Sequence, residues 1–297
     1  MENKISFSII VPTYNRANLI GKTIESLLDQ KHNSFEIIVI DDGSSDNTKE
    51  IIEKINSTKI KYYQIENSER GFARNYGARL AKGDYINFFD SDDMALTNHL
   101  LVADQTILNT NYPEVFHLNY AFLNTNGNIS KNNNKEILEA NKKLISGNIL
   151  SCNGVFIKKD IALRFPFNES RNLSVSEDWD LWLRLSARYK IQMLPTITSY
   201  IVNHQGRSVM SFNEEKLLAR TNELINSLSN DQVFMSVYPN SLIKIKAHML
   251  SYMSLHAVLC GYKKKAFYYL MYAIKINYLE IFTKRFVAII THLIKVK

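Results

Sequence analysis

The stretch GFARNYGARLAKGDYINFFDSDD, from Gly71 to Asp93, joins a helical pattern to a short buried strand and ends in a cluster of acids. Its first part predicts a helix over 71–81, and DYINFFD predicts a strand over 84–90. Three carboxylates then fall within four residues, and they repel one another unless a cation or a ligand compensates their charge. This order indicates an α/β fold with a ligand site at the carboxyl end of a strand.

The same alternation of strand and helix runs through the residues before Gly71. Buried strands are predicted at Ile5–Val11, Phe35–Asp41 and Lys59–Ile65. A helix is predicted over 18–30, and another after Ser45 or Asp46, either of which can cap it. Strands separated by helices of this length indicate right-handed βαβ units and a doubly wound, mainly parallel sheet.

The pattern after Met94 is looser. We expect a helix over 97–110, strands over 114–123 and 154–159, and a polar loop over 127–135. Residues 176–189 predict an amphipathic helix with both tryptophans on its apolar side, and the chain after Ser211 reads as helical to its end.

Composition narrows the class of protein. The net charge of +7 is concentrated after Asn240, where ten Lys or Arg accompany one acid. The start of the chain lacks the features of a secretory signal, and no apolar run is long enough to span a bilayer. Cys152 and Cys260 are too few for a disulfide framework, so we expect both to be reduced core residues of a cytoplasmic protein. The basic segment matches no nucleic-acid reader motif.

Polar clusters follow each of the four predicted strands. They are PTYNR, DDGSSD, ERGFARN and the acidic DSDD. Because ligands bind beyond the carboxyl ends of parallel strands, these clusters should converge on one crevice. A hard divalent cation would suit the acids, particularly where phosphate oxygens complete its shell. Ordinary turns, or a helix cap from Asp92 or Asp93, are the structural alternatives.

The motifs IIVPTYNR, IIVIDDGSSDNT, RGFARNYGARLAKGDYINFFDSDD and EDWDLWLRL occur in this order over roughly residues 5–210. As a set they resemble the inverting family-2 glycosyltransferases of the GT-A fold. The resemblance implies a GT-A-type α/β catalytic domain over 1–212, with a nucleotide-sugar half over 1–93 and an acceptor half over 94–212. Residues 213–297 would form a basic helical extension.

The resemblance also implies roles for individual residues. Asp178 would be the catalytic base, with Glu177 as the alternative. Asp92 would bind Mn²⁺ or Mg²⁺, joined by His204, while Asp93 and Trp179 would lie on the acceptor side. The nucleotide would be held by Pro12, Thr13, Tyr14, Asn15, Asp42, Arg74, Asp90 and Ser91.

Other interpretations of these residues stay open at this stage. Asp178 reads equally well as an ordinary N-terminal acid behind a Ser176 cap. Asp180 would lie on the solvated face of the same helix, and His204 could be structural. Asp93 could cap a helix. Arg207 and Ser208 could close over the diphosphate or form a surface ion pair.

The implied reaction moves a hexosyl or N-acetylhexosaminyl group from a UDP-sugar to a hydroxyl of a glycan or lipid-linked glycan, in cell-surface polysaccharide synthesis. A metal would stabilise the leaving diphosphate and a carboxylate would deprotonate the acceptor. The alternative is a non-catalytic nucleotide-sugar-binding or scaffold protein. A dinucleotide oxidoreductase is excluded because PTYNRAN contains no glycine.

Three segments after Asn240 suggest amphipathic helices rich in lysine: LIKIKAHMLSYMSLHAVL, KKKAFYYLMYAIKINYL and KRFVAIITHLIKVK. They would either pack as a small basic helical subdomain or bind the anionic inner face of the cytoplasmic membrane. In the second case Lys263–Lys265 and Lys284–Arg285 would lie near lipid headgroups.

Overall fold

The computed structural model describes residues 4–131, 140–204 and 212–294. The chain divides into two compact units. Asn141–Ile149 and Asn172–Arg188 join the C-terminal helices in the second unit. The first unit consists of Met1–Ala140, Leu150–Arg171 and Tyr189–Gln205. The units therefore divide the chain differently from the predicted boundary at residue 212.

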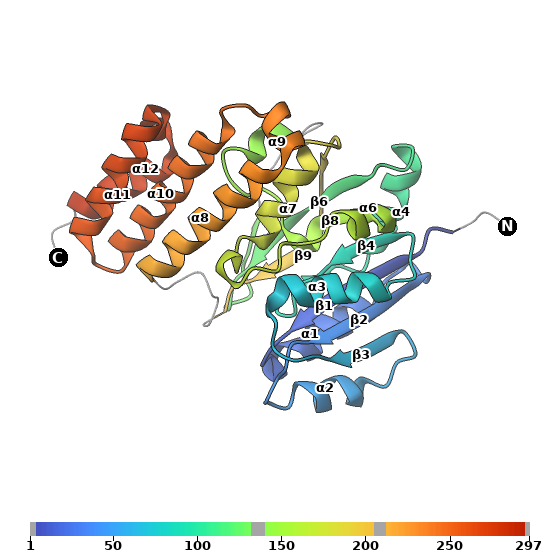
Figure 1. Ribbon diagram of the computed structural model, residues 1–297. Helices are drawn as coiled ribbons and strands as arrows, with labels where there is room; N and C mark the ends of the chain where they lie inside the picture. The colour runs from blue at the N-terminus through green and yellow to red at the C-terminus, as the bar shows by residue number, and fades with distance from the viewer. Residues whose placement is uncertain (1–3, 132–139, 205–211, 295–297) are drawn as a thin grey trace. The chain divides into compact units, whose positions relative to one another are not determined.

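Four strands form the parallel part of the first unit's sheet, in the order β3-β2-β1-β4 (Figure 1). The strands are β1 (Phe7–Thr13), β2 (Phe35–Asp41), β3 (Ile60–Gln64) and β4 (Tyr85–Phe88). The connecting helices are α1 (Ala17–Leu28), α2 (Thr48–Ile55) and α3 (Glu69–Leu80). Each predicted strand and helix of this region is confirmed, with ends displaced by a few residues.

Helices pack closely on this sheet, and this packing fixes the strand ends that carry the polar clusters. Every residue of β1 is buried, and Ile20, Ile24 and Leu27 of α1 are fully buried in the same apolar cluster. Burial of each such side chain contributes about 1.5–3 kcal/mol. On α3, a Cβ at Gly77 would lie 2.5 Å from the Ile10 side chain, so only glycine allows the helix to approach β1 this closely.

The sheet continues beyond β4 as β8 (Val155–Lys158), β6 (Val115–Leu123), β9 (Gln192–Val202) and β5 (Met94–Ala95), with β7 (Ile129–Lys131) paired to β6. β8 runs antiparallel to β4 and β6, whereas β9 is parallel to β6. The predicted α/β sheet is thus confirmed, but it is mixed rather than mainly parallel after β4. β9 was not predicted. The helices of this part are η1 (Cys152–Gly154), α4 (His99–Asn109) and α6 (Lys159–Arg164).

The second unit is helical. Its elements, in chain order, are α5 (Asn141–Leu144), the short turn η2 (Arg171–Leu173), α7 (Glu177–Ser186), α8 (Glu214–Asn230), α9 (Gln232–Val237), α10 (Ser241–Leu259), α11 (Lys263–Ile276), η3 (Tyr278–Phe282) and α12 (Lys284–Ile294). α10 packs against α8, α11 and α12 (Figure 1). Leu250, Met253 and Ala257 of α10 lie in the apolar clusters between them.

These contacts correct two expectations. α10 is the buried centre of its unit rather than an amphipathic surface helix, because neighbouring helices cover most of its surface. Cys152 is buried as expected, but Cys260 is exposed at the end of α10, and both are free. No helix in the described ranges is long and apolar enough to cross a membrane.

Candidate active site

The turns after β1 and β2 form one hydrogen-bonded surface. The Asp42 N–H donates to the Thr13 carbonyl (2.8 Å), which joins the ends of the two strands. The Asn15 N–H donates to Ser44 Oγ (2.8 Å), and Asn15 Oδ1 accepts from the Ser45 N–H (2.9 Å). Asn15 has a φ of 51°, a left-handed conformation that asparagine tolerates. The predicted convergence of PTYN and DDGSS is therefore observed.

The Tyr14 side chain of this surface is accessible to a ligand. Tyr14 is 49% exposed, so its ring is available to an incoming planar group. Pro12 and Thr13 are buried within β1, and Thr13 Oγ1 has no hydrogen-bond partner among the described residues.

Asp42 is held by the turn that precedes α3. The residue is 5% exposed, and its carboxylate accepts from the Ser68 N–H (2.7 Å). Asn67 Nδ2 donates to the Asp42 carbonyl (2.9 Å). Burial raises the pKa of the Asp42 carboxyl, while N–H groups of Ser68 and Glu69 act in the opposite direction. The segment after β3 therefore contacts the polar cluster that follows β2.

Arg74 and Asp90 form an ion pair between α3 and the end of β4. Arg74 Nη2 lies 2.8 Å from Asp90 Oδ1. The arginine side chain is only 2% exposed, and its guanidinium lies 5.1 Å from the centre of the Phe167 ring. Asp90 is 38% exposed, so the pair presents its acidic partner to solvent. Next to it, Ser91 is buried and its carbonyl accepts from Thr23 Oγ1 (3.0 Å).

Asp92 and His204 lie together although 112 residues separate them. His204 Nε2 is 2.9 Å from Asp92 Oδ2, and Arg16 Nη2 is 3.8 Å from the same oxygen. Two ligands of one octahedral ion, each about 2.1 Å from it, stand roughly 3 Å apart, so this pair fits a shared divalent cation. In the described ranges no three His, Cys, Asp or Glu residues gather as a metal site. Such an ion would need further ligands from a substrate.

Asp93 is buried and ties the acidic cluster to the rest of the sheet. Its oxygens accept from the Val202 N–H of β9 (2.8 Å) and from Asn153 Nδ2 (2.7 Å). Asn153 Oδ1 in turn accepts from the Asp90 N–H (2.9 Å). Burial raises the pKa of Asp93 well above its ordinary value, and the charges of Asp90 and Asp92 add to this shift.

The helix-cap interpretation of the acidic cluster is wrong. The next helix, α4, begins at His99 with Asn98 at its N-cap position. Asp92 and Asp93 are therefore too far upstream to cap it. Ser45 and Asp46 also miss the cap position of α2, which Asn47 occupies, although Asp46 Oδ1 accepts from the Thr48 N–H (3.1 Å).

Two residues of this site were not singled out from the sequence. Arg16 is the last residue of the PTYNR cluster, so the motif contained it, but only the structure places it 3.8 Å from Asp92. Asn153 precedes β8 and contacts residues 60 or more positions away. No local pattern marks it, because its importance comes from the pairing of β4 with β8.

In the second unit, Asp178 lies in the first turn of α7. It is half-buried, and its Oδ2 accepts from Asn148 Nδ2 (2.8 Å) while Oδ1 accepts from the Trp179 N–H (2.7 Å). Ser176 occupies the N-cap position, but its side chain makes no capping hydrogen bond. The helix dipole favours the ionised form of an acid at this position.

The neighbours of Asp178 are more buried than it is. Glu177 is 4% exposed, and Trp179 is 3% exposed with its indole N–H donating to the Leu144 carbonyl (2.9 Å). Asp180 is fully buried and pairs with Arg184 (2.8 Å), so its predicted place on a solvated face is wrong. Trp182 is fully buried, as expected. Arg207 and Ser208 lie outside the described residues.

Comparison with known proteins identifies the family of this chain. The model of glycosyl transferase family 2 matches residues 8–161, just over half of the chain. The Escherichia coli enzyme UDP-Glc:alpha-D-GlcNAc-diphosphoundecaprenol beta-1,3-glucosyltransferase WfgD is 28% identical over 265 residues, which cover 88% of this chain and 96% of that protein. An uncharacterised glycosyltransferase of Rickettsia bellii is 32% identical over 190 residues, 61% of this chain. The chain spans only 26% of that longer relative.

A solved structure supports the fold. The crystal structure of S. aureus TarS 1–349 in complex with UDP-GlcNAc matches with a TM-score of 0.64 at 19% identity, over 91% of each chain. This likeness confirms the predicted α/β architecture of GT-A type with helices at the C-terminal side of the sequence.

Proposed function

Because this chain belongs to glycosyl transferase family 2, we propose that it transfers a sugar from a UDP-sugar to a hydroxyl of a glycan or lipid-linked glycan, with inversion, in cell-surface polysaccharide synthesis. The observation that carries the proposal is the Arg74–Asp90 pair beside the Asp92–His204 pair, at the carboxyl end of β4. The E. coli relative is named for UDP-Glc and a diphosphoundecaprenol acceptor, and TarS was crystallised with UDP-GlcNAc.

The uridine would be held by the turns after β1 and β2. Tyr14 is exposed and suits stacking on a uracil ring, while Asp42 would accept from the uracil N–H. Pro12, Thr13 and Asn15 shape the backbone beside it. Asp90 would contact the ribose, because its carboxylate is solvent-accessible and oriented by Arg74. Ser91 would contribute through its backbone.

Asp92 and His204 would hold Mn²⁺ or Mg²⁺. Lewis-acid stabilisation of the departing diphosphate is the chemistry that this ion supplies when bound. Arg16, 3.8 Å from Asp92, would bring an additional positive charge to the same side of the donor. Asp93 would position the cluster instead of taking the acceptor-side role expected from the sequence, because its two oxygens already accept from the Val202 N–H and Asn153 Nδ2.

Asp178 would be the general base. It is the accessible member of the Glu177–Asp178 pair, and Asn148 orients one of its oxygens. An ionised carboxylate can take the proton of the acceptor hydroxyl as that oxygen attacks the anomeric carbon, which makes the displacement a single inverting step. Trp179 would support an acceptor sugar, since tryptophan offers a large apolar surface to a pyranose ring.

A donor screen tests this proposal. We expect purified protein to release UDP from at least one of UDP-Glc, UDP-Gal, UDP-GlcNAc and UDP-GalNAc with Mn²⁺, and to lose this activity in EDTA. GDP-mannose serves as the control for the nucleotide. If calorimetry detects no UDP binding with or without Mn²⁺, the proposal fails. Tight UDP binding without turnover of any donor, with acceptors present, would favour the non-catalytic alternative.

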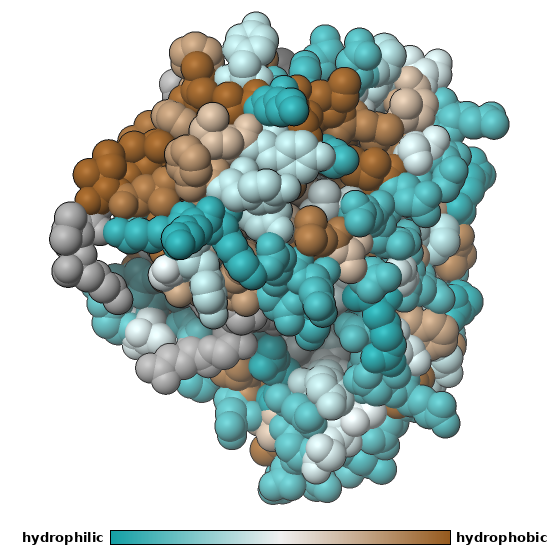
Figure 2. All heavy atoms as spheres, turned by 60° about the vertical axis from the view of Figure 1, so that its left-hand side comes forward, coloured by the Kyte–Doolittle hydropathy of each residue, from teal (hydrophilic) through white to brown (hydrophobic). Residues whose placement is uncertain are grey.

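We also propose that the second unit contacts an anionic membrane surface. Figure 2 shows apolar side chains gathered in its upper left part, and the most exposed apolar residues of the second unit lie on three of its C-terminal elements. We call this set the tail patch. It comprises Phe267, Tyr268 and Met271 of α11, Tyr278, Leu279, Ile281 and Phe282 of η3, and Val287 and Ile294 of α12.

Lysines accompany the tail patch. Lys263, Lys264 and Lys284 are exposed on the same elements, and the segment from Asn240 carries ten basic residues against one acid. An apolar surface with a basic surround is complementary to anionic headgroups above acyl chains. This complementarity favours a lipid surface over a second copy of the chain, whose patch would carry the same charge.

We expect Phe282→Ser to weaken binding to phosphatidylglycerol vesicles about tenfold in co-sedimentation, because Phe282 is 77% exposed and loses its apolar contact. Leu108→Ser is the matched control, since Leu108 is 53% exposed on α4 of the first unit. Binding should also fall with added salt. Equal binding by wild type and Phe282→Ser would refute the membrane contact, and a concentration-dependent dimer broken by Phe282→Ser would identify a second copy as the partner.

A further inference from the structure

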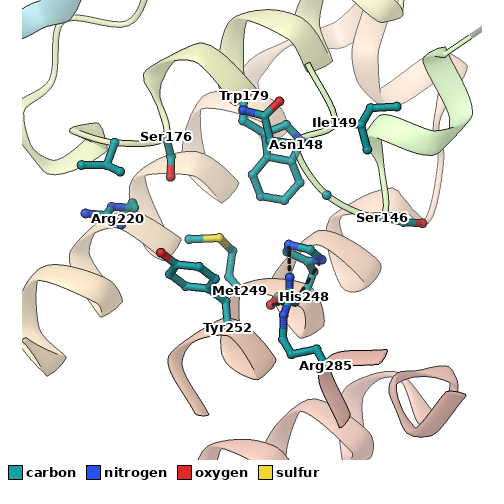
Figure 3. Close-up of a pocket in the computed structure, with 12 residues that line it drawn as sticks. Ser146, Asn148, Ile149, Ser176, Trp179, Arg220, His248, Met249, Tyr252 and Arg285 are labelled. Carbon is teal, nitrogen blue, oxygen red and sulfur yellow. Dashed lines mark hydrogen bonds between the residues drawn. The ribbon is translucent and has the colours of Figure 1, made fainter. Parts of the chain in front are cut away.

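A cavity of about 380 Å³ lies within the second unit. Its walls come from the loop after α5, the start of α7, and the helices α8, α10 and α12 (Figure 3). In the close-up, Trp179, Tyr252, Met249 and His248 surround a common space, with Arg220 and Arg285 at its sides. The volume is at the lower end of the range for small-ligand sites.

The cavity is positively charged. Arg220 and Arg285 line it, and none of the twelve lining residues is an acid. The nitrogens of Arg285 lie 3.2 and 3.1 Å from the two ring nitrogens of His248, and Arg285 also donates to the His248 carbonyl and to Ser251 Oγ. The His248 ring is neutral, because burial and the Arg285 charge lower its pKa to about 3. The carbonyl and the hydroxyl carry no charge, so none of these partners neutralises Arg285.

The charges of both arginines act on the same surroundings. Burial is the larger effect on both neighbours: it raises the pKa of Tyr252 and lowers the pKa of His256. The charges of Arg220 and Arg285 lower the pKa of each of them. Glu280 is the acid whose charge acts on Arg285, and it does not line the cavity. The field inside the cavity therefore favours an anion.

The walls of the cavity are held in place. Trp179 is 3% exposed, its indole N–H is bonded to the Leu144 carbonyl, and its ring centre is 5.1 Å from that of His248. Gly147 has a φ of 144°, and a Cβ there would lie 2.6 Å from the His248 ring. Only glycine fits this turn, so the loop that carries Asn148 has a defined course over the histidine.

The cavity is connected directly to the candidate base. Asn148 lines it and donates to Asp178 Oδ2 (2.8 Å), and Trp179 is the next residue in the chain. A ligand held against Asn148 and Trp179 would therefore lie one side chain away from Asp178.

We propose that this cavity binds the phosphate or diphosphate ester of the acceptor, with Arg220 and Arg285 contacting the anionic oxygens and Trp179 packing against the attached sugar. Arginine suits this task because its planar donor set matches phosphate geometry. The assignment to an acceptor rests on the proposed glycosyl transfer, whereas the affinity for a phosphate does not.

Calorimetry with inorganic pyrophosphate, in EDTA and with excess UDP to fill the donor site, tests the cavity alone. We expect Arg220→Gln to weaken pyrophosphate binding about 10- to 100-fold. Lys244→Gln is the matched control, because it removes the same charge from an exposed position on α10 that does not line the cavity. Arg285→Gln gives a second measurement at the cavity, and thermal melting shows that each variant is folded.

Hydrolysis of the UDP-sugar without acceptor reports on the donor site and should be unchanged in Arg220→Gln, while KM for a diphosphate-linked acceptor rises. Unchanged pyrophosphate affinity in both arginine variants would overturn the cavity site even if hydrolysis continues. Absence of UDP binding and of UDP-sugar turnover in wild type with acceptors present, together with Arg220-dependent pyrophosphate binding, would instead overturn the proposed function. If phosphatidylglycerol vesicles compete with pyrophosphate and lose affinity in Arg220→Gln, the site binds a lipid headgroup and the acceptor assignment is wrong.

Discussion

Asp92→Asn is expected to reduce kcat for sugar transfer by about 10³-fold, the upper range for loss of one preorganised electrostatic contact in a transition state. The asparagine keeps the shape of the side chain but removes the charge that faces His204 Nε2 at 2.9 Å and Arg16 at 3.8 Å. A neutral amide is a weak ligand for a hard cation, so the charge that builds on the leaving diphosphate would be poorly compensated.

The measurement is steady-state UDP release, together with calorimetry of UDP in Mn²⁺ and in EDTA. Wild type should bind UDP more tightly with Mn²⁺, and Asp92→Asn should lose most of that difference. Asp160→Asn, an exposed acid on α6, is the control for the change of charge. A variant that keeps both its turnover and its Mn²⁺-dependent affinity would show that Asp92 does not bind the metal.

Asp178→Asn should reduce kcat by about 10²–10⁴-fold, the usual contribution of a general base, without weakening UDP binding. The Asn148 side chain and the Trp179 N–H already orient the two oxygens of Asp178, so the reduction would come from lost basicity rather than from a displaced side chain. This separation of binding from chemistry distinguishes the base from a residue of the donor site.

Glu177→Gln is the matched comparison, because it changes the adjacent acid by the same chemistry. Glu177 is 4% exposed, so its substitution should be detected mainly as a lower melting temperature. Transfer that survives Asp178→Asn but is lost in a folded Glu177→Gln variant would exchange the two roles. Loss of UDP affinity in Asp178→Asn would contradict the assignment to the acceptor side.

The parallel half of the first unit was readable from the sequence because each element there follows a local rule. Apolar runs such as Phe35–Asp41 have the length of a buried strand, and Ile20, Ile24 and Leu27 have the spacing of a helix face. β9 follows no such rule. Pro195 and a threonine-rich stretch interrupt its alternation, and its register with β6 shifts near Asn119.

The site shows the same division. Asp90, Asp92 and Arg74 belong to contiguous motifs, which is why the sequence alone could name them as candidates. His204 follows β9, so its contact with Asp92 depends on a strand that the sequence did not predict. Asn153 is a positioning residue through long-range pairing alone. The prediction for Asp180 was wrong because it assumed that an acid on a helix faces water. α7 is buried on nearly every side, and Arg184 neutralises the charge of Asp180.

The interleaving of the two units along the chain constrains how this protein can be divided. Asn141–Ile149 and Asn172–Arg188, which supply Asn148, Trp179 and Asp178, belong to the helical unit yet are encoded inside the part of the sequence that forms the sheet. A gene fragment ending before α8 would leave the apolar side of α7 uncovered, since α7 packs on α8. The helical unit therefore cannot be exchanged between relatives as a removable module. Chimeras that alter acceptor choice would have to transplant three separate stretches at once.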